Sequence, residues 1–574
     1  MEENKQHSWQ TYLLIIIIGL LLFVPFLGSV HLFDWDELNF AEAAREMLVT
    51  GDYMTVRIDY QPFHEKPPLF FWLQAGSMKV FGVNEFAARF PNAIIGIISL
   101  IFIFYIGKKL FDEKLGLLWV LAYIGSYLPQ FYFKTGLIDP TFNLLIFAGI
   151  YYTFEFFTQR MYIRNEAIKS KYKSTIAAGI FIALAILTKG PVAWGLAALC
   201  WLLFWFFNKE KIQFPAKNFI LFTIVSFLPS VVWYMILSII NGGNILEQFI
   251  NYQYRLLTTQ DASHGGPFYY HFAVLLTGCF PASIIALRGF RKQADDSPYQ
   301  EGFRKMAIIL LSVVLIVFTI VSTKIIHYSS LAYFPLTFLA AYAMYNLIYR
   351  ELRWKTSTSW LTGITGILWA LVFIFLPFTL MNVKLILPSI KDEFTREILK
   401  TPVQWSGYEL LPGAFYLAVI IFSLILFKRR KLLKGFLYLF GGTAIVIFTA
   451  LPLIAPKIDE YTQGTVIEFY KKLQGKDCYV KVLDISNYKY GQYFYTQIPL
   501  QLSAYFLKIP EDKFESWLLN GDIDKPAYFI CKAKDSRIYL ENQEIKPIYS
   551  KNGFTFMVRE PMPVFQKKPY YAGY

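Results

Sequence analysis

Long apolar segments alternate with short polar connectors along most of this chain. About thirteen of the segments are nearly free of charge and approach the length of about 17 to 25 residues that a helix needs to cross a bilayer. They lie at 11–30, 90–107, 115–133, 140–157, 175–188, 191–207, 218–239, 270–287, 306–322, 328–349, 360–381, 410–427 and 435–453. The pattern predicts a polytopic α-helical membrane protein with about thirteen transmembrane helices.

The polar connectors differ in charge from one side of the predicted membrane to the other. Lys and Arg gather in alternate connectors, at 108–114, 160–173, 208–217, 288–305, 349–355 and 428–434. Because such clusters are retained in the cytoplasm, we place the N-terminus there and the C-terminus outside. The net charge of +14 follows from these connectors, so we do not expect nucleic-acid binding.

The pattern changes after the last apolar segment. Short alternating runs at 478–485, 527–533 and 553–560 are separated by Gly, Pro, Asn and Asp, which is typical of strands and turns. We therefore expect a transmembrane domain at 1–455, with its first outward loop at 31–89, and a small extracytoplasmic α/β domain at 456–574. Two cysteines, Cys478 and Cys531, lie in the latter, and the sequence leaves open whether they form a disulfide.

The first outward loop opens with a cluster of acids, Asp34, Asp36 and Glu37. Apolar residues then recur with helical spacing from 38 to 48, which predicts an amphipathic helix along the membrane surface, ended by Gly51. Asp34 or Asp36 can cap that helix. One cap uses one carboxylate, so at least one of the three acids is left for another task.

A second helix is predicted later in the same loop. The sequence HEKPP precedes an apolar stretch at 69–81 that Gly82 closes. Glu65 and Lys66 then stand at a helix N-terminus, where free N–H groups and the helix dipole favour anions such as phosphate. A lysine that extends its charge to the membrane surface is the alternative interpretation of Lys66.

Isolated charges mark the outer ends of several apolar segments. A charge near mid-bilayer costs about 2.5 to 3.5 kcal/mol, so these residues should face a wet cavity or a partner, unless they reach the membrane surface. The acid among them is Asp139. The outward cations are Lys66, Lys189, Arg255 and Lys324, which together could neutralise a phosphate or pyrophosphate, with Tyr328 as an added neutral donor.

Histidine is concentrated on the predicted outward face. Five of the six histidines, His31, His64, His264, His271 and His327, fall on or beside it. His264 and Glu65 could together hold a divalent cation, since imidazole and carboxylate both suit zinc. A histidine that is hydrogen-bonded within a loop is the alternative.

Several strings resemble those of a known enzyme family. DELNFAEAAREMLVTGDY and HEKPPLFFWLQAGSMKVFGVNEFAAR resemble the first outward loop of the ArnT-like and protein-O-mannosyltransferase-like glycosyltransferases of the GT-C fold. LIDP, LTKGP, DASHGGPFYY and the segment 324–328 extend the match along the chain. Thirteen spans with an outer C-terminal domain also resemble the aminoarabinose transferase architecture.

The resemblance implies roles for particular residues. The catalytic carboxylate would be Asp36, accompanied by Glu37, with Asp139 as a second acid. The residues that it implies for the carrier phosphate are Lys66, Lys189, Arg255, Lys324 and Tyr328, and for a metal, Glu65 and His264. The chain departs from the family in having His64 where an aromatic residue is usual, and KIIHY where the aminoarabinose branch has K-L-P-x-Y.

The implied activity is inverting transfer of a hexose or pentose from a polyprenyl-phosphate donor, in a bacterial inner membrane. The acceptor would be a lipid A-type glycolipid, a glycan or an exported protein. Asp36 would deprotonate an acceptor hydroxyl, whereas a phosphate acceptor needs no base. The alternatives are a lipid-linked glycan ligase or polymerase of the same fold, and a transporter or lipid flippase, which would favour charges through the full depth of the membrane.

Overall fold

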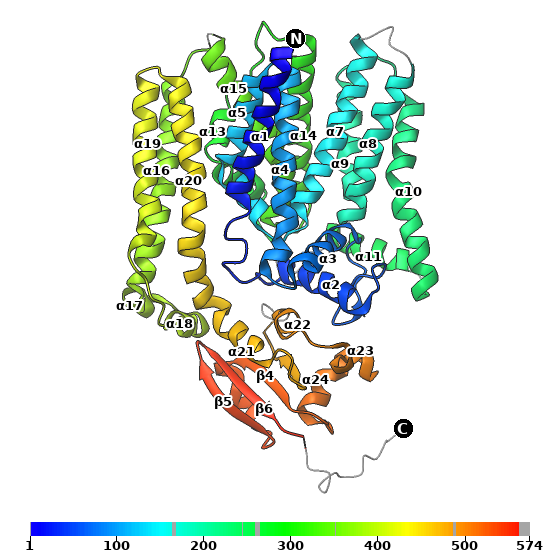
Figure 1. Cartoon of the computed structure of the whole chain (residues 1–574), viewed down its shortest axis with the longest axis vertical. Coiled ribbons are helices and arrows are strands. Elements are labelled where there is room, and N and C mark those ends of the chain that lie inside the picture. The colour runs from blue at the N-terminus through cyan, green and yellow to red at the C-terminus, as the bar shows by residue number, and fades with distance from the viewer. Residues whose placement is uncertain are drawn as a thin grey trace.

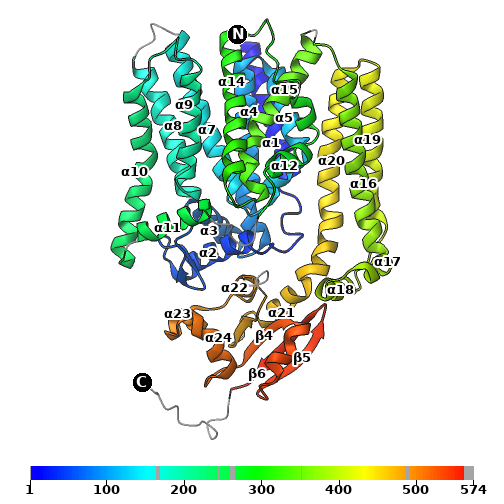
Figure 2. The same cartoon turned by 180° about the vertical axis from the view of Figure 1, so that it is seen from behind.

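The structure is a computed structural model. It describes residues 2–162, 168–243, 245–258, 265–350, 352–485 and 490–561. Long helices form a bundle at one end of the molecule, and the C-terminal domain lies at the other (Figure 1). The N-terminus is at the far end of the bundle from that domain in both side views (Figures 1 and 2). The first loop, at 31–89, lies between the bundle and the domain.

Each of the thirteen predicted segments contains a helix, although the helix in the first segment, 11–30, ends at Phe23. The bundle helices are α1 (Glu2–Phe23), α4 (Glu85–Leu110), α5 (Glu113–Ile124), α6 (Tyr127–Phe131), α7 (Asp139–Tyr162), α8 (Ile168–Lys189), α9 (Val192–Phe206), α10 (Ala216–Asn241), α12 (Tyr270–Gly278), α13 (Ala282–Ala286), α14 (Pro298–Ile320), α15 (Tyr333–Tyr349), α16 (Thr356–Met381), α19 (Leu411–Lys428) and α20 (Leu432–Asp459). Three predicted segments are each divided. The segment 115–133 forms α5 and α6, 270–287 forms α12 and α13, and 328–349 begins in a 3-10 helix, Ile326–Ala332, and continues as α15.

Within the described residues, eight helices are long and apolar enough to cross a membrane. A ninth is added if Tyr127–Lys134 and Asp139–Met161, which meet at an angle of 118°, count as one bent span. Trp9–Phe23 and Val192–Phe206 are shorter apolar helices. The multi-span membrane fold is therefore confirmed, whereas the count of thirteen spans and the side that faces the cytoplasm stay predictions.

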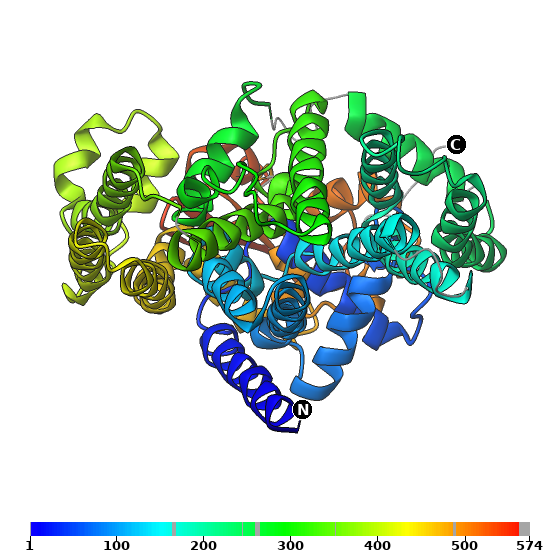
Figure 3. The same ribbon diagram turned by 90° about the horizontal axis from the view of Figure 1, so that it is seen from above.

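The bundle is apolar on its outside as well as in its core. Along the most apolar stretch of α16 only 17% of the residues are buried, against 89% along that of the span Ile326–Tyr349. Seen from above, the yellow helices of the α16, α19 and α20 group stand at one edge and the cyan and green helices α8 to α10 at the other (Figure 3). Such exposed apolar faces are those that lipid chains cover.

The first loop contains two helices and a small hairpin. They are α2 (Asp36–Thr50), β1 (Arg57–Ile58), β2 (Gln61–Pro62) and α3 (Leu69–Phe81). Gly51 and Gly82 follow the two helices with φ of +71° and +80°, left-handed values that favour glycine. Both helix ends agree with the prediction.

The surroundings of α2 differ from the prediction. Its residues from Glu37 to Met47 are all buried, and it packs against α3 and against α22 (Gly491–Thr496) of the C-terminal domain. The apolar stripe therefore joins a protein core and does not lie on lipid. The predicted acidic cap is also wrong, because Trp35 precedes the first turn and no side chain caps it.

The C-terminal domain is built on one four-stranded sheet in the order β3-β4-β6-β5. Its strands are β3 (Tyr479–Val482), β4 (Ala527–Lys532), β5 (Ile545–Lys551) and β6 (Phe554–Arg559). β3 runs parallel to β4, and β6 is antiparallel to both β4 and β5. The edge strand β5 was not predicted, because Pro547 interrupts the alternating pattern that indicates a strand. Proline is tolerated there because the strand lies at the edge of the sheet. Cys478 and Cys531 are buried free thiols.

Short helices complete the structure. Beside the sheet these are α21 (Thr465–Leu473), α23 (Ala504–Leu507), α24 (Glu511–Asn520) and α25 (Ser536–Leu540), and near the bundle α11 (Ile245–Thr258), α17 (Val383–Ile386), α18 (Glu393–Leu399) and the 3-10 helix η3 (Ile326–Ala332). Figures 1 and 2 show α11, α17 and α18 at the same end of the bundle as the first loop.

Polar contacts fasten the first loop to the C-terminal domain. The backbone N–H of Leu32 donates to the hydroxyl of Tyr495 at 2.7 Å, and His31 pairs with Asp459 at 2.6 Å. The guanidinium of Arg45 donates to the carbonyl of Ile498. These contacts and a shared apolar core hold the first loop against the C-terminal domain.

Candidate active site

A cavity of about 1380 Å³ lies between the first loop and the bundle. Its polar lining includes Asp34, Asp36, Glu65, Lys66, Asp139, Lys189, Arg255, His327 and Tyr328. Its apolar lining includes Phe142, Val192, Leu196, Val317, Phe318 and Leu331, which come from α7, α9, α14 and η3. One space thus joins a cluster of charges to an apolar wall among the helices.

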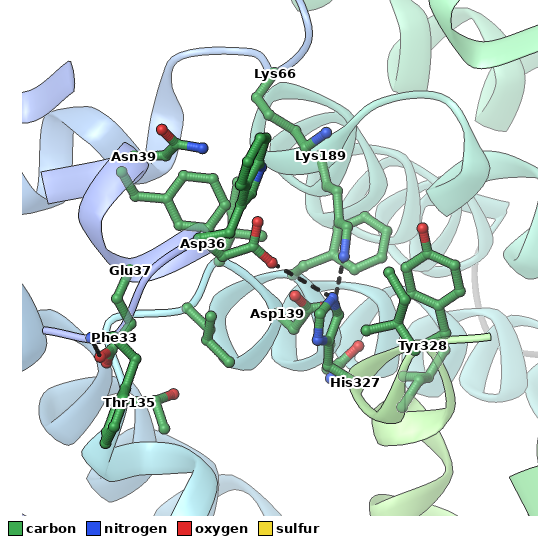
Figure 4. A pocket seen from close by; sticks show the side chains of 18 of the residues that line it. Phe33, Asp36, Glu37, Asn39, Lys66, Thr135, Asp139, Lys189, His327 and Tyr328 are labelled. Atoms are coloured by element: carbon green, nitrogen blue, oxygen red, sulfur yellow. Dashed lines mark hydrogen bonds and ion pairs between the residues drawn. The ribbon is translucent and has the colours of Figure 1, made fainter. Parts of the chain in front are cut away.

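Asp36 lies in the first turn of α2 and points into the cavity (Figure 4). Its carboxylate is 3.7 Å from Nε2 of His327, which comes from η3 on the opposite wall. About a third of the Asp36 side chain (36%) is exposed. The carboxylate is therefore accessible from the cavity and has a basic group beside it.

Asp139 and Lys189 form a second charged pair at the cavity wall. Asp139 begins α7 and Lys189 ends α8, and the ammonium donates to the carboxylate at 2.6 Å (Figure 4). The carboxylate is almost fully buried, whereas the ammonium also lies 5.4 Å from the centre of the Tyr328 ring. The pair holds the Lys189 charge at a fixed place beside Tyr328.

Lys66 and Arg255 bring further positive charge to the same space. Burial and the charge of Lys189 lower the pKa of Lys66, although Glu65 opposes the shift. The guanidinium of Arg255 is 4.0 Å from the carboxylate of Glu65, and both side chains are partly exposed. Such a long and hydrated ion pair is weak, so both partners can rearrange around a ligand.

Glu37 faces the interior of the protein. The guanidinium of Arg89 donates to its two carboxylate oxygens at 3.0 and 2.8 Å, and the backbone N–H groups of Phe33 and Gly136 add two more bonds. Burial alone would raise the pKa of Glu37, but these donors outweigh it and hold the pKa below its ordinary value. The carboxylate thus ties α2 to α4 and to the segment before α7.

Lys324 lies apart from the expected cluster of cations. Its ammonium donates to the carbonyl oxygens of Phe318, Thr319 and Val321, at the C-terminal end of α14. Those carbonyls lack partners within the helix, which explains why a lysine three to six residues further along the chain binds them. The structure therefore differs from the prediction that Lys324 faces the ligand.

Asp34 is held by the C-terminal domain. The backbone N–H of Tyr490 donates to its carboxylate at 3.4 Å. Burial nevertheless raises the pKa of Asp34 to about 7. The ring of the adjacent Trp35 contacts the Tyr490 ring edge-on at 4.7 Å, so Tyr490 supports the whole turn before Asp36.

Of the predicted metal pair, Glu65 can be placed in the structure and His264 cannot. Glu65 lines the cavity and pairs with Arg255, and His264 lies outside the described residues. Across the part of the chain that the structure describes, no three His, Cys, Asp or Glu side chains gather in a way that could hold a metal ion. Zinc binding stays a prediction.

Sequence reasoning does not single out two residues of this region. His327 stands out in the sequence only as one of the outward histidines, although its position next to Tyr328 in the departing string KIIHY is a signal. In the sequence, Arg89 is simply the last residue of the predicted first loop. Its role as the partner of Glu37 depends on a contact across 52 residues, which no local pattern reveals.

Comparison with known proteins finds likenesses in sequence and in fold. A family model described as dolichyl-phosphate-mannose-protein mannosyltransferase matches residues 65–233. The crystal structure of ArnT from Cupriavidus metallidurans bound to undecaprenyl phosphate superposes with a TM-score of 0.75 at 17% identity, covering 96% of this chain and 98% of that one. The chain has an ArnT-like GT-C fold. The resemblance seen in the motifs is thereby confirmed at the level of the fold.

Two relatives are similar to this chain in sequence. The undecaprenyl phosphate-alpha-4-amino-4-deoxy-L-arabinose arabinosyl transferase of Pectobacterium atrosepticum is 24% identical over 63% of this chain and 64% of its own length. An uncharacterized protein of Aquifex aeolicus is 24% identical over 58% of this chain and 63% of its own. The chain thus matches a little under two thirds of these relatives.

Proposed function

We propose that this ArnT-like protein transfers a glycosyl group from a polyprenyl-phosphate donor to an acceptor at the outer face of a bacterial inner membrane. The observation that carries the proposal is the single cavity, which combines accessible acid, several cations and an apolar wall. The donor has the same three parts: a sugar, a phosphate and a lipid tail. Relatives named for undecaprenyl-phosphate donors support this donor class.

The cations would bind the phosphate of the donor. Lys66, Lys189 and Arg255 come from three different elements and line one space, with Tyr328 beside Lys189. The lipid tail would lie along the apolar wall from α7, α9 and α14. Lys324 is left out of this set because helix carbonyls already engage its ammonium.

The same cations would supply most of the catalysis. As the bond between the sugar and the phosphate breaks, negative charge grows on the departing carrier phosphate. Fixed cations in a cavity that is partly shielded from water stabilise that charge strongly. Attack by the acceptor from the opposite face would invert the anomeric centre, whether the sugar is a hexose or a pentose.

The three predicted acids would divide into different roles. Asp36 is the accessible one and would act on the acceptor. Asp139 would hold Lys189 at the phosphate, and Glu37 would hold the start of α2 through Arg89. Only Asp36 is thus proposed as a catalytic residue, and the other two position their neighbours.

The test is transfer in proteoliposomes that contain labelled polyprenyl-phosphate sugar and a mixed extract of outer-membrane lipids, glycans and exported proteins. Asp36→Asn should bind the labelled donor as the wild type does and lose transfer by at least ~100-fold. The matched control is Asp52→Asn, in the same loop but outside the cavity, which should transfer normally.

Wild-type turnover by Asp36→Asn would refute the proposed role. A flippase would move the donor to the opposite leaflet without forming a labelled product, so the assay separates the two functions. A ligase or polymerase of the same fold would require a longer lipid-linked glycan as donor, which a parallel reaction can supply. Mass spectrometry of the labelled product then identifies the acceptor.

A further inference from the structure

His327 is held firmly at the wall of the cavity. The hydroxyl of Ser330 donates to the His327 carbonyl, and the side chain of Asn143 on α7 donates to the same hydroxyl oxygen at 2.7 Å. The imidazole is 14% exposed. This network fixes the backbone of η3 against α7, and with it the position from which the imidazole extends towards Asp36.

Charged groups from several elements surround the imidazole. Asp36 faces it from α2, while Asp139 and Lys189 stand at the ends of α7 and α8 (Figure 4). The charge of Lys66, in the segment before α3, also acts on the imidazole. On η3 itself, the centre of the Tyr328 ring lies 5.5 Å from that of the imidazole. Lys324, which precedes η3, donates to the carbonyls at the end of α14.

Among these acids, only one is placed to exchange a proton with His327. The carboxylate of Asp139 is engaged by Lys189 at 2.6 Å, and Glu65 pairs with Arg255. Within the described residues, Asp36 is the carboxylate in ion-pair contact with the imidazole, at 3.7 Å. A shift of less than ~1 Å would bring the two groups into hydrogen-bond contact.

We infer that Asp36 and His327 act as a pair that removes a proton from the acceptor, and that the acceptor group is therefore a hydroxyl. The inference deepens the proposed function and rests on it. The histidine gives the proton a second site, because Nε2 of the imidazole lies 3.7 Å from the carboxylate of Asp36.

The transfer forms one bond and breaks another at the anomeric carbon. The acceptor oxygen forms a bond to that carbon, and the bond from the carbon to the phosphate oxygen breaks, with its electron pair leaving on the carrier phosphate. The acceptor proton passes to Asp36 and then to Nε2 of His327. Water takes the proton from the imidazole after the product leaves.

The charge of Asp36 also favours a hydroxyl. A neutral hydroxyl can approach a carboxylate and donate a hydrogen bond to it. A phosphate acceptor is already ionised, has no proton that must be removed, and would meet the negative charge of Asp36 at close range. The pair would therefore hinder a phosphate and help a hydroxyl.

The experiment compares pH–rate profiles of wild type, His327→Gln and His31→Gln in proteoliposomes. The donor is labelled polyprenyl-phosphate sugar, and the acceptor is an alkyl glycoside or the same glycoside carrying one phosphate. His31 is the matched control, because it also pairs with an aspartate, at 2.6 Å, but lies outside the cavity lining. Donor binding and the thermal midpoint of each variant show whether it is folded.

We expect transfer to the plain glycoside, with an acid limb in the wild-type profile where the imidazole becomes charged. His327→Gln should be ~10- to 100-fold slower near neutral pH, and its acid limb should move towards the range of a carboxylate. His31→Gln should keep the wild-type profile. Folded His327→Gln with a slower rate but an unchanged profile would show a merely structural role and overturn the pair.

The two acceptors test the hydroxyl inference separately from the proposed function. Transfer by the wild type to the phosphorylated glycoside alone would overturn the hydroxyl inference while leaving the glycosyltransferase proposal intact. A wild-type protein that binds the donor and modifies neither acceptor nor the mixed extract would instead refute the proposed function. If His327→Gln does not fold, His327→Asn replaces it in the same comparison.

Discussion

The buried pair of Glu37 and Arg89 allows a quantitative prediction for Arg89→Gln. Both side chains are about 5% exposed, and the guanidinium also donates to the carbonyls of Leu27, Val30 and His31. Removing one partner of a buried ion pair costs about 3 to 5 kcal/mol, because the other charge is left without compensation. The lost carbonyl bonds place Arg89→Gln at the upper end of that range.

The cost of protonating Glu37 gives a second value for the free energy of unfolding that Arg89→Gln loses. Without Arg89, burial should raise the pKa of Glu37, so the folded variant would take up a proton. Protonating a carboxyl of ordinary pKa about 4.3 at pH 7 costs about 3.7 kcal/mol, at 1.36 kcal/mol per unit. This cost falls by about 1.4 kcal/mol for each unit of pH below 7. The wild type behaves differently, because the lowered pKa of Glu37 keeps its stabilisation until the pH falls below the ordinary carboxyl range.

The assay is the free energy of unfolding in mixed micelles with increasing dodecyl sulfate, measured from pH 7 to pH 5. The gap between wild type and Arg89→Gln should be largest at pH 7 and should shrink as the pH falls. Adding Glu37→Gln should restore most of the loss. Lys525→Gln, which breaks the exposed pair with Asp477, should cost no more than about 1 kcal/mol at any pH. A loss below about 1 kcal/mol for Arg89→Gln, or a gap that does not change with pH, would refute the reasoning.

Three further predictions concern single charges. Lys189→Met should raise the KM for the donor at least ~10-fold and lower the thermal midpoint, because Asp139 is left buried without its partner; an unchanged KM would contradict the phosphate site. Lys324→Met should lower the thermal midpoint but leave the KM unchanged, because its ammonium caps α14, and donor-binding assays would expose a direct role. Burial raises the pKa of Asp59 to about 7 despite Lys481, so its contribution to stability is present below pH 4 and lost as the pH rises through about 7. Asp59→Asn, at a φ of +54° that asparagine tolerates, should therefore be more stable than wild type at pH 8 and not at pH 4, as thermal midpoints at the two pH values would show.

Local patterns predicted the helices and turns well. Apolar runs become helices because lipid leaves backbone groups no other partner, and glycines at 51 and 82 end the two helices of the first loop as expected. The strands of the C-terminal sheet followed from alternation, except for β5. Its proline and exposed edge position remove the signal on which such a prediction depends.

Long-range partners could not be predicted. The sequence shows that Glu37, Asp139 and Lys324 are costly to bury but does not say what compensates each charge. Glu37 finds an arginine, Asp139 a lysine, and Lys324 the end of a helix. Motifs grouped the residues around one cavity, whereas only three-dimensional contacts separated the accessible Asp36 from acids that hold the scaffold.

The packing of α2 against the C-terminal domain has a consequence for biosynthesis. Arg45 donates to a carbonyl 453 residues further along the chain, and Tyr60 to the same carbonyl. The ribosome therefore releases the first loop early and its supporting partners last. Until the C-terminal domain has folded and docked, these buried polar groups lack their final partners. The start of α2 in a nascent chain would thus take its final position only after the last strands have been made, so an activity that depends on Asp36 would begin with the completed chain.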